Sequence, residues 1–204
     1  MTTPLFRAHP WHGISAGENA PEIINVYVEI VPSDTIKYEL DKNSGILKVD
    51  RPQKYSNYCP ALYGFIPQTY CGNSVAEVCM QVSAKSGLEG DKDPMDVCVL
   101  TERNIPRGDI LLKARPLGGF RLVDKNEVDD KIISVLVEDS MYGELKDISE
   151  LPKQWIDRLR HYFLTYKEIP GEGKHIVEIV EIYGSDAAKD IIRKSMVDYS
   201  NISE

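Results

Sequence analysis

Alternating hydrophobic and polar residues along much of the chain predict a mainly β protein. In the segment Asn25–Val31, Tyr27 and Glu29 fall on one face of a strand, and the valine and isoleucine side chains between them fall on the other. The segments Ile36–Leu40 and Ile46–Asp50 alternate in the same way, and the Asn-Ser-Gly turn between them predicts a β-hairpin. Further strands are predicted at Val75–Val82, Asp96–Leu100, Ile110–Arg115, Gly119–Asp124, Lys131–Val137 and His175–Tyr183.

Helical spacing of apolar residues appears only late in the chain. Between Leu151 and Tyr166 these residues recur every three or four positions, and Pro152 suits the first turn of a helix. Ile169-Pro170-Gly171 is a signal for its end, and a second helix should run from a cap at Ser185 to about Tyr199. Many short strands with two C-terminal helices predict a small closed β-barrel with helices packed on it.

The length and the absence of a linker or repeat indicate one domain over residues 1–204. Residues 1–20 are expected to form an irregular N-terminal arm, which carries the pair His9 and His12. Pro10 prevents a regular helix through both histidines, so we expect them to pack or to lie at the surface rather than to bind a metal.

Composition narrows the classes of function. The chain has 32 acidic and 24 basic residues and a net charge of −8, which argues against a nucleic-acid partner because such proteins need a basic surface. No run of about 18 apolar residues predicts a membrane span, and residues 1–20 lack the apolar core of a secretory signal. The cysteines Cys59, Cys71, Cys79 and Cys98 form no CxxC pair, so free thiols and a cytoplasmic location are expected.

The stretch from Asp91 through Asp93 and Pro94 to Asp96 carries the most chemical information. Its three carboxylates repel one another unless cations lie between them, and hard divalent cations, above all Mg²⁺, prefer oxygen ligands. Pro94 favours extended backbone before it, where Asp91 and Asp93 would point to one side. An EF-hand fits poorly, because an aspartate takes the place of its glycine and a hydrophobic strand follows. Taken alone, this string of aspartates fits an acidic turn before a strand as well as it fits a metal site.

Acidic residues recur outside this stretch. Glu29 is one, and a polar hairpin loop should bring Asp124 and Asp129 close together. Basic and phenolic residues accompany them at Lys37, Arg51, Tyr63, Lys131, Tyr166 and Lys167. Each of these alone is most simply a surface or core residue, but together they describe carboxylates for several metals facing donors for phosphate oxygens.

In this ordered series the chain resembles the family I soluble inorganic pyrophosphatases. The family motif Asp-x-Asp-Pro-x-Asp, followed by a hydrophobic residue, matches Asp91–Val97. Further matches are Ile36–Glu39, Val49–Arg51, Tyr63–Phe65, Asp124 with Asp129 and Lys131, and Tyr166-Lys167. The resemblance covers most of the chain from Glu22 onward and implies a five-stranded, OB-like closed barrel with flanking helices.

The resemblance also implies a role for each matched residue. Asp91, Asp96 and Asp129 would hold a first metal, Asp96 would bridge to a second, Asp124 with Asp129 would hold a third, and Glu29 would contact a further one through water. Asp93 would act as the general base toward the attacking water. The phosphoryl groups would be bound by Lys37, Arg51, Tyr63, Lys131, Tyr166 and Lys167. Glu39 would support these side chains without contacting the phosphoryl groups itself. The expected reaction is hydrolysis of pyrophosphate to two orthophosphates with several Mg²⁺ ions, which Mn²⁺ could replace, in a homo-oligomer that is a dimer or a hexamer.

One departure from the family concerns Cys59, which stands where relatives often have a tyrosine, four residues before Tyr63. A thiol at the margin of the phosphate site would be reactive, whereas the alternative is a small buried hydrophobic residue. Two other functions stay open. A non-catalytic OB-type module conflicts with the charge of −8, and a passive cation-binding protein leaves the lysine, arginine and tyrosine residues unexplained.

Overall fold

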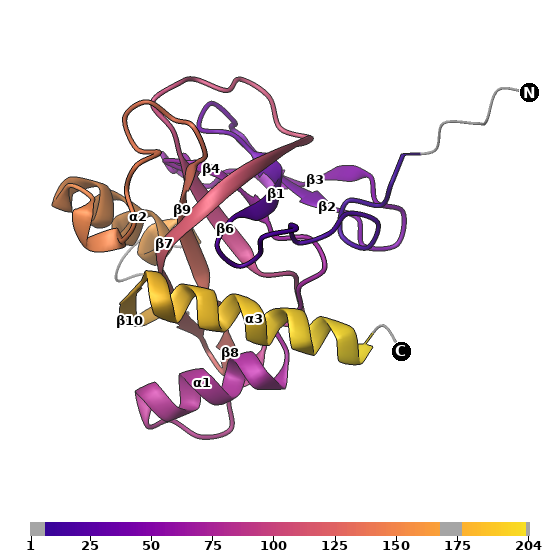
Figure 1. Cartoon of the computed structure of the whole chain (residues 1–204), viewed down its shortest axis with the longest axis vertical. Coiled ribbons are helices and arrows are strands. Elements are labelled where there is room, and N and C mark those ends of the chain that lie inside the picture. The colour runs from indigo at the N-terminus through magenta and orange to yellow at the C-terminus, as the bar shows by residue number, and fades with distance from the viewer. Residues whose placement is uncertain (1–6, 168–176, 203–204) are drawn as a thin grey trace, which may run out of the picture.

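The computed structural model describes residues 7–167 and 177–202, and in that part of the chain five strands close into a ring (Figure 1). The ring runs through β1 (Ile24–Ile30), β4 (Leu62–Phe65), β6 (Asp96–Leu100), β9 (Lys131–Leu136) and β7 (Ile110–Asp124), and β7 pairs with β1 again. Within the ring the β6–β9 pair is parallel and the other pairs are antiparallel. This arrangement confirms the predicted mainly β fold and agrees with an OB-like barrel.

The length of β7 allows the ring to close. Its first part pairs with β1, its middle with β9 and its last part with β10 (Val177–Gly184). The register against β9 shifts between Pro116 and Gly118, where the proline has no N–H to donate to the ladder. The two strands predicted here are therefore one continuous strand with a bulge.

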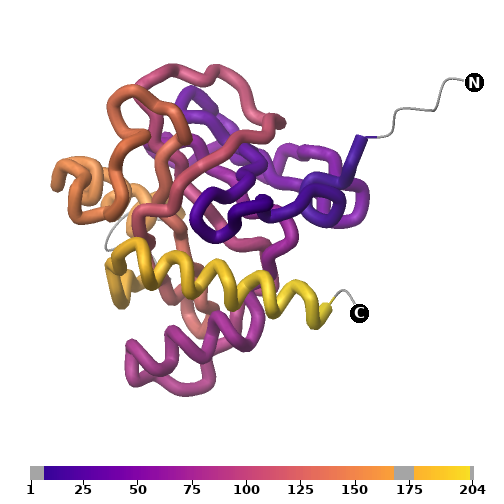
Figure 2. Tube along the Cα trace, in the orientation of Figure 1, coloured from indigo at the N-terminus to yellow at the C-terminus, as the bar shows by residue number. Residues whose placement is uncertain are grey.

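The predicted hairpin is confirmed as β2 (Ile36–Leu40) and β3 (Leu47–Pro52), which form a small separate sheet. The N-terminal segment, residues 7–23 before β1, lies beside the hairpin in Figure 2. Trp11 from this segment and Leu40 from the hairpin pack with Tyr27. Both faces of β1 are therefore buried. The short strands β5 (Glu89–Gly90) and β8 (Glu127–Val128) pair at the end of the main sheet.

The segment predicted as a strand at Val75–Val82 is instead the helix α1 (Asn73–Ser83), so this prediction was wrong. A short apolar run is ambiguous between the two periods, and here Val75, Ala76 and Cys79 form the buried face of a helix. The carboxylate of Asp198 accepts hydrogen bonds from backbone N–H groups at the start of α1, at 3.0 Å from Gly72 and 3.0 Å from Ser74. A tertiary contact thus fixes where this helix begins.

Both predicted C-terminal helices are confirmed, as α2 (Lys153–Thr165) and α3 (Ser185–Ile202), with a short 3₁₀ turn at Ile148–Glu150 before them. The predicted stop signal at residues 169–171 and the first two residues of the predicted last strand lie outside the described residues. Helices α1 and α3 lie side by side, whereas α2 lies apart from them and contacts β10 (Figure 1). None of the described helices is long and apolar enough to cross a bilayer.

Candidate active site

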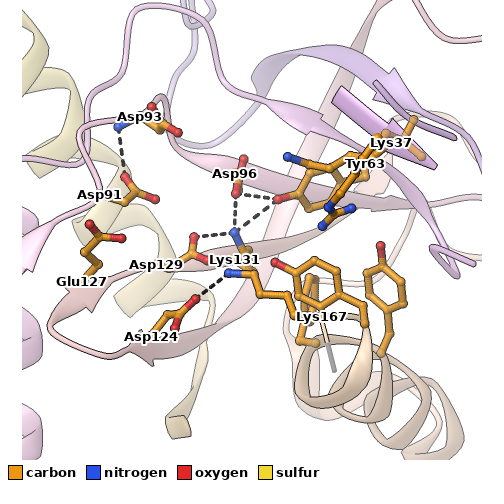
Figure 3. A pocket seen from close by; sticks show the side chains of 15 residues that line it. Lys37, Tyr63, Asp91, Asp93, Asp96, Asp124, Glu127, Asp129, Lys131 and Lys167 are labelled. Carbon is orange, nitrogen blue, oxygen red and sulfur yellow. Dashed lines mark hydrogen bonds and ion pairs between the residues drawn. The ribbon is translucent and has the colours of Figure 1, made fainter. Parts of the chain in front are cut away.

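A pocket of about 220 Å³ opens where β6 and β9 begin and β7 ends (Figure 3). The predicted residues that line it are Lys37, Arg51, Tyr63, Asp91, Asp93, Asp96, Asp124, Asp129, Lys131, Tyr166 and Lys167. Glu29 and Glu39 lie in an adjoining hollow of about 90 Å³, which shares Lys37, Tyr63, Asp93 and Asp96 with the pocket. The fold therefore gathers the predicted acidic, basic and phenolic side chains in one place.

Asp91 and Asp93 reach the pocket from a tight turn, which corrects the expectation of extended backbone. Lys92 between them has a left-handed φ of 65°, and the N–H of Asp93 donates to Asp91 Oδ1 at 3.0 Å. The turn is held on Cys71, whose carbonyl accepts from the Lys92 N–H at 3.1 Å and whose N–H donates to the Asp93 carbonyl at 2.8 Å. Gly90 permits this approach, because a Cβ there would lie 2.0 Å from the Cys71 carbonyl oxygen.

Lys131 connects the carboxylates at the centre of the pocket. Parallel pairing of β6 and β9 places Asp96 opposite Lys131, and the Lys131 ammonium donates to both Asp96 and Asp129. The hydroxyl of Tyr63, from the neighbouring strand β4, donates to Asp96 at 2.5 Å. With its side chain only 3% exposed, Lys131 is a buried cation held by acidic partners.

Burial and crowding of like charges perturb these groups. Burial, together with the nearby Asp129 and Asp96, raises the pKa of Asp91 well above its usual value. Burial also raises the pKa of Asp96, against the opposing effect of Lys131. Burial disfavours the Lys131 ammonium, but Asp129 and Asp96 outweigh it and raise the pKa of Lys131 well above its usual value. One buried ammonium thus faces three crowded carboxyl groups, and this crowding favours the neutral form of Asp91.

The C-terminal end of α2 closes another side of the pocket. Lys167 follows the helix, and its Nζ donates to Asp124 Oδ2, on β7, at 2.6 Å. The ring of Tyr166 stacks on Tyr162 with 5.1 Å between centroids. Lys167 therefore reaches Asp124 at the start of the acidic loop between β7 and β9, and Tyr166 lines the same pocket.

The β2–β3 hairpin supplies Lys37 and Arg51. Lys37 Nζ lies 3.1 Å from a Glu39 oxygen and 2.9 Å from an Asp50 oxygen. Arg51 Nη1 is buried and has no hydrogen-bond partner among the described residues. A buried guanidinium nitrogen without a partner indicates that an anionic ligand completes this part of the pocket.

Glu29 is a buried acid beside the pocket rather than in its wall. Its carboxyl group accepts the Leu40 N–H at 2.7 Å, and the residue is only 7% exposed. Burial raises the pKa of Glu29 to about 8, although the hydrogen bond from Leu40 opposes that shift. A contact of Glu29 with a cation through water agrees with this position but stays a prediction.

The pocket also contains residues that the sequence prediction missed: Ile30, Glu127, Tyr162 and Phe163. Glu127 belongs to the same acidic loop as Asp124 and Asp129, so its charge was a usable signal. Tyr162 lies one helical turn before Tyr166, and that spacing places both on one face of α2.

Two features of the sequence have structural explanations. His9 Nδ1 accepts the N–H groups of Trp11 and His12 at 3.2 Å, and His12 Nδ1 is 2.8 Å from the Tyr199 hydroxyl, so both histidines are used in local packing as expected. Cys59 is 1% exposed in a hydrophobic cluster with Cys98 and Tyr162 and is not among the residues that line the pocket. This burial favours the alternative of a small buried hydrophobic residue, and the reactivity of the thiol stays a prediction. All four cysteines are free, as predicted.

The donor set fits divalent metal ions in chemistry. In the described part of the chain no three His, Cys, Asp or Glu side chains form a ready metal centre, and the Lys131 ammonium joins Asp96 to Asp129. Asp91 nevertheless lies close enough to Asp129 and Asp96 for their charges to raise its pKa. A hard cation between these carboxyl groups would relieve that repulsion, and its preferred ligands are carboxylate oxygens of this kind.

A five-stranded ring whose carboxylates face lysine, arginine and tyrosine donors is the fold and site of an enzyme that acts on phosphoryl groups. The sequence model of the inorganic pyrophosphatase family matches residues 26–200, so the chain belongs to that family. Inorganic pyrophosphatases from Chlamydia trachomatis serovar L2 and Chlamydia muridarum are 52% and 50% identical over 204 residues, which cover 98% of each chain. The crystal structure of inorganic pyrophosphatase from Thermus thermophilus has a TM-score of 0.79 at 25% identity and covers 95% of this chain and 99% of that one.

Proposed function

We propose that this protein hydrolyses inorganic pyrophosphate to two orthophosphates. The observation that carries the proposal is the single pocket in which clustered carboxylates face Lys37, Arg51, Tyr63 and Lys167. Pyrophosphate is a polyanion that the carboxylates alone would repel, so cations must lie between them. The inorganic pyrophosphatase family depends on divalent metal ions, generally Mg²⁺.

The carboxylates are assigned to the metal ions as follows. Asp91, Asp96 and Asp129 would hold a first ion, with Asp96 bridging to a second, Asp124 with Asp129 would hold a third, and Glu29 would contact a further ion through water. Bound there, Mg²⁺, or Mn²⁺ in its place, would offset the charge of the substrate and acidify the attacking water.

Asp93 is the proposed general base. It lines the pocket, and its place in the turn is fixed by the backbone bonds to Cys71 and by Pro94 after it. Its carboxylate would accept a proton from water as the water oxygen bonds to one phosphorus and the bond from that phosphorus to the bridging oxygen breaks. The electron pair of the broken bond leaves with the second phosphate.

The basic and phenolic residues are proposed to hold the two phosphoryl groups. Arg51 is suited to a bidentate grip, and its partnerless Nη1 supports that role. Lys37, Lys131 and Lys167 would offset charge that develops on the leaving phosphate, and Tyr63 and Tyr166 would donate hydrogen bonds to phosphate oxygens. Glu39 would orient Lys37, which it contacts at 3.1 Å.

Phosphate release from pyrophosphate, measured in Mg²⁺ and again in excess EDTA, tests the proposal. Release in Mg²⁺ that stops in EDTA supports it. Mg²⁺ binding without phosphate release would favour a passive cation-binding protein. Binding of a labelled oligonucleotide without phosphate release would favour a non-catalytic OB-type module.

We further propose that the chain acts as one domain, with residues 1–20 as its arm, in a cytoplasmic homo-oligomer. Exposed apolar side chains on β10 and α3, among them Ile182, Val197 and Ile202, support association with a second copy. Light scattering at micromolar concentration tests this, since a dimer or hexamer has two or six times the chain mass of 23.0 kDa.

A further inference from the structure

The carboxylate of Asp93 is bound by a lysine that has no part in the proposed chemistry. Lys42 Nζ donates to Asp93 Oδ1, and the two side chains are 44% and 41% exposed. Among the residues that the structure describes, no other side chain is hydrogen-bonded to this carboxylate. In the described part of the chain, the proposed general base therefore has Lys42 as its one hydrogen-bonded side-chain partner.

Lys42 projects from a turn with a well-defined backbone. The turn joins β2 to β3 and is closed by bonds from the Asp41 N–H to the Ile46 carbonyl at 2.9 Å and from the Gly45 N–H to the Asp41 carbonyl at 2.8 Å. The Lys42 carbonyl lies 3.1 Å from His9 Nε2. Since His9 Nδ1 accepts hydrogen bonds from two N–H groups, the ring proton is on Nε2. The Nε2–H group therefore donates a hydrogen bond to the backbone carbonyl of Lys42. The N-terminal segment thus holds the turn from which Lys42 extends.

The placement of Lys42 separates it from the substrate. It lines the hollow of about 90 Å³ between the N-terminal segment and the Asp93 turn, together with Trp11 and Pro94. It is not part of the wall of the larger pocket, whereas Asp93 lines both. The ammonium therefore reaches Asp93 from the hollow beside the pocket, and Lys42 is not among the residues that line the pocket in which the phosphoryl groups are proposed to bind.

We propose that Lys42 is a positioning residue, which fixes the Asp93 carboxylate in the orientation needed to accept a proton from the attacking water. The inference rests on the proposed role of Asp93. A carboxylate that is two-fifths exposed would otherwise sample several rotamers, and the loss of a single orientation reduces the rate of a proton transfer. Lys42 acts through Asp93, so its effect should appear in kcat and not in the affinity for substrate or metal.

The test compares Lys42→Met, which removes the ammonium but keeps the chain length, with Lys42→Arg, which keeps a cation. Lys42→Met should lower kcat about tenfold, the cost of one charge-assisted hydrogen bond, with the KM for Mg-pyrophosphate within about twofold of wild type. Mg²⁺ affinity measured by calorimetry should not change. Lys42→Arg should recover most of kcat. Lys48→Met is the matched control: Lys48 belongs to the same hairpin and pairs with Asp41 at 3.6 Å, and its loss should leave kcat unchanged.

A double-mutant cycle with Asp93→Asn decides whether Lys42 acts through Asp93. In that background Lys42→Met should change kcat less than about twofold, because no base remains to be positioned. An equal loss in both backgrounds, a raised KM with unchanged kcat, or wild-type kcat in Lys42→Met would each overturn the inference. These outcomes all require a wild-type enzyme that hydrolyses pyrophosphate. Inactivity of the wild type would instead contradict the proposed function itself.

Discussion

Asp93 differs from the neighbouring carboxylates because its position is set by a turn with a left-handed residue before it and a proline after it. Asp93→Asn keeps the size and the hydrogen-bonding oxygen of the side chain but removes the base. We expect kcat to fall by about 10²–10⁴, with the fold and Mg²⁺ binding retained. Steady-state kinetics from pH 7 to 9 and Mg²⁺ calorimetry measure this. Activity near that of the wild type over the whole pH range would remove Asp93 from the role of general base.

Arg51 tests the phosphate side of the pocket at the same scale. Lysine provides a single point charge, whereas the Arg51 guanidinium, whose Nη1 is buried, can donate two parallel hydrogen bonds. Arg51→Lys should therefore raise the KM for Mg-pyrophosphate about tenfold without a change in thermal stability. Arg193→Lys is a suitable control, because Arg193 is exposed and lies 3.6 Å from Glu22 at the surface. Equal kinetics for the two variants would mean that Arg51 does not hold phosphate.

At the scale of elements, α1 depends on a contact from α3. Asp198 is 6% exposed and accepts backbone N–H groups of Gly72, Ser74 and Val75, and the last two belong to the first turn of α1, where N–H groups lack a partner within the helix. Asp198→Ala should lower the free energy of unfolding by about 2 kcal/mol, measured by urea denaturation. Asp190→Ala, an exposed change on the same helix, should cost less than about 0.5 kcal/mol. Comparable losses from both variants would show that the cap does not stabilise α1.

The contact of Asp198 with α1 explains why the sequence did not predict that helix. Strict alternation was enough for β1 and the β2–β3 hairpin, helical spacing was enough for α2, and the cap signal at Ser185 was enough for α3. The short run at Val75–Val82 was ambiguous, and its outcome depends on Asp198, which is more than a hundred residues away. In the site, the order of residue types and the family resemblance named eleven of the side chains that line the pocket, but not Ile30, Glu127, Tyr162 or Phe163. The Lys92 turn and the contact of Lys42 with Asp93 were not predictable, because both arise from tertiary packing.

At the scale of the whole molecule, burial of Glu29 links stability to pH. Its pKa is about 8 in the folded chain and about 4.5 without burial, so the folded chain favours the neutral acid. The contribution of Glu29 to stability is complete below about pH 4.5 and is lost as the pH rises through about 8. In EDTA, Glu29→Gln should therefore become more stable relative to wild type between pH 5 and pH 9, as measured by urea denaturation at each pH. A constant difference between the two proteins would contradict the assigned pKa.

The central claim is that the carboxylate cluster and the opposing cations form one metal-dependent site for pyrophosphate. Its most direct test is the rate of phosphate release from pyrophosphate as free Mg²⁺ is raised from a chelated start. The account predicts no release in EDTA, a rate that rises with Mg²⁺ to saturation, and two phosphates for each pyrophosphate consumed. Release that is indifferent to chelation, or no release at any Mg²⁺ concentration, would contradict it.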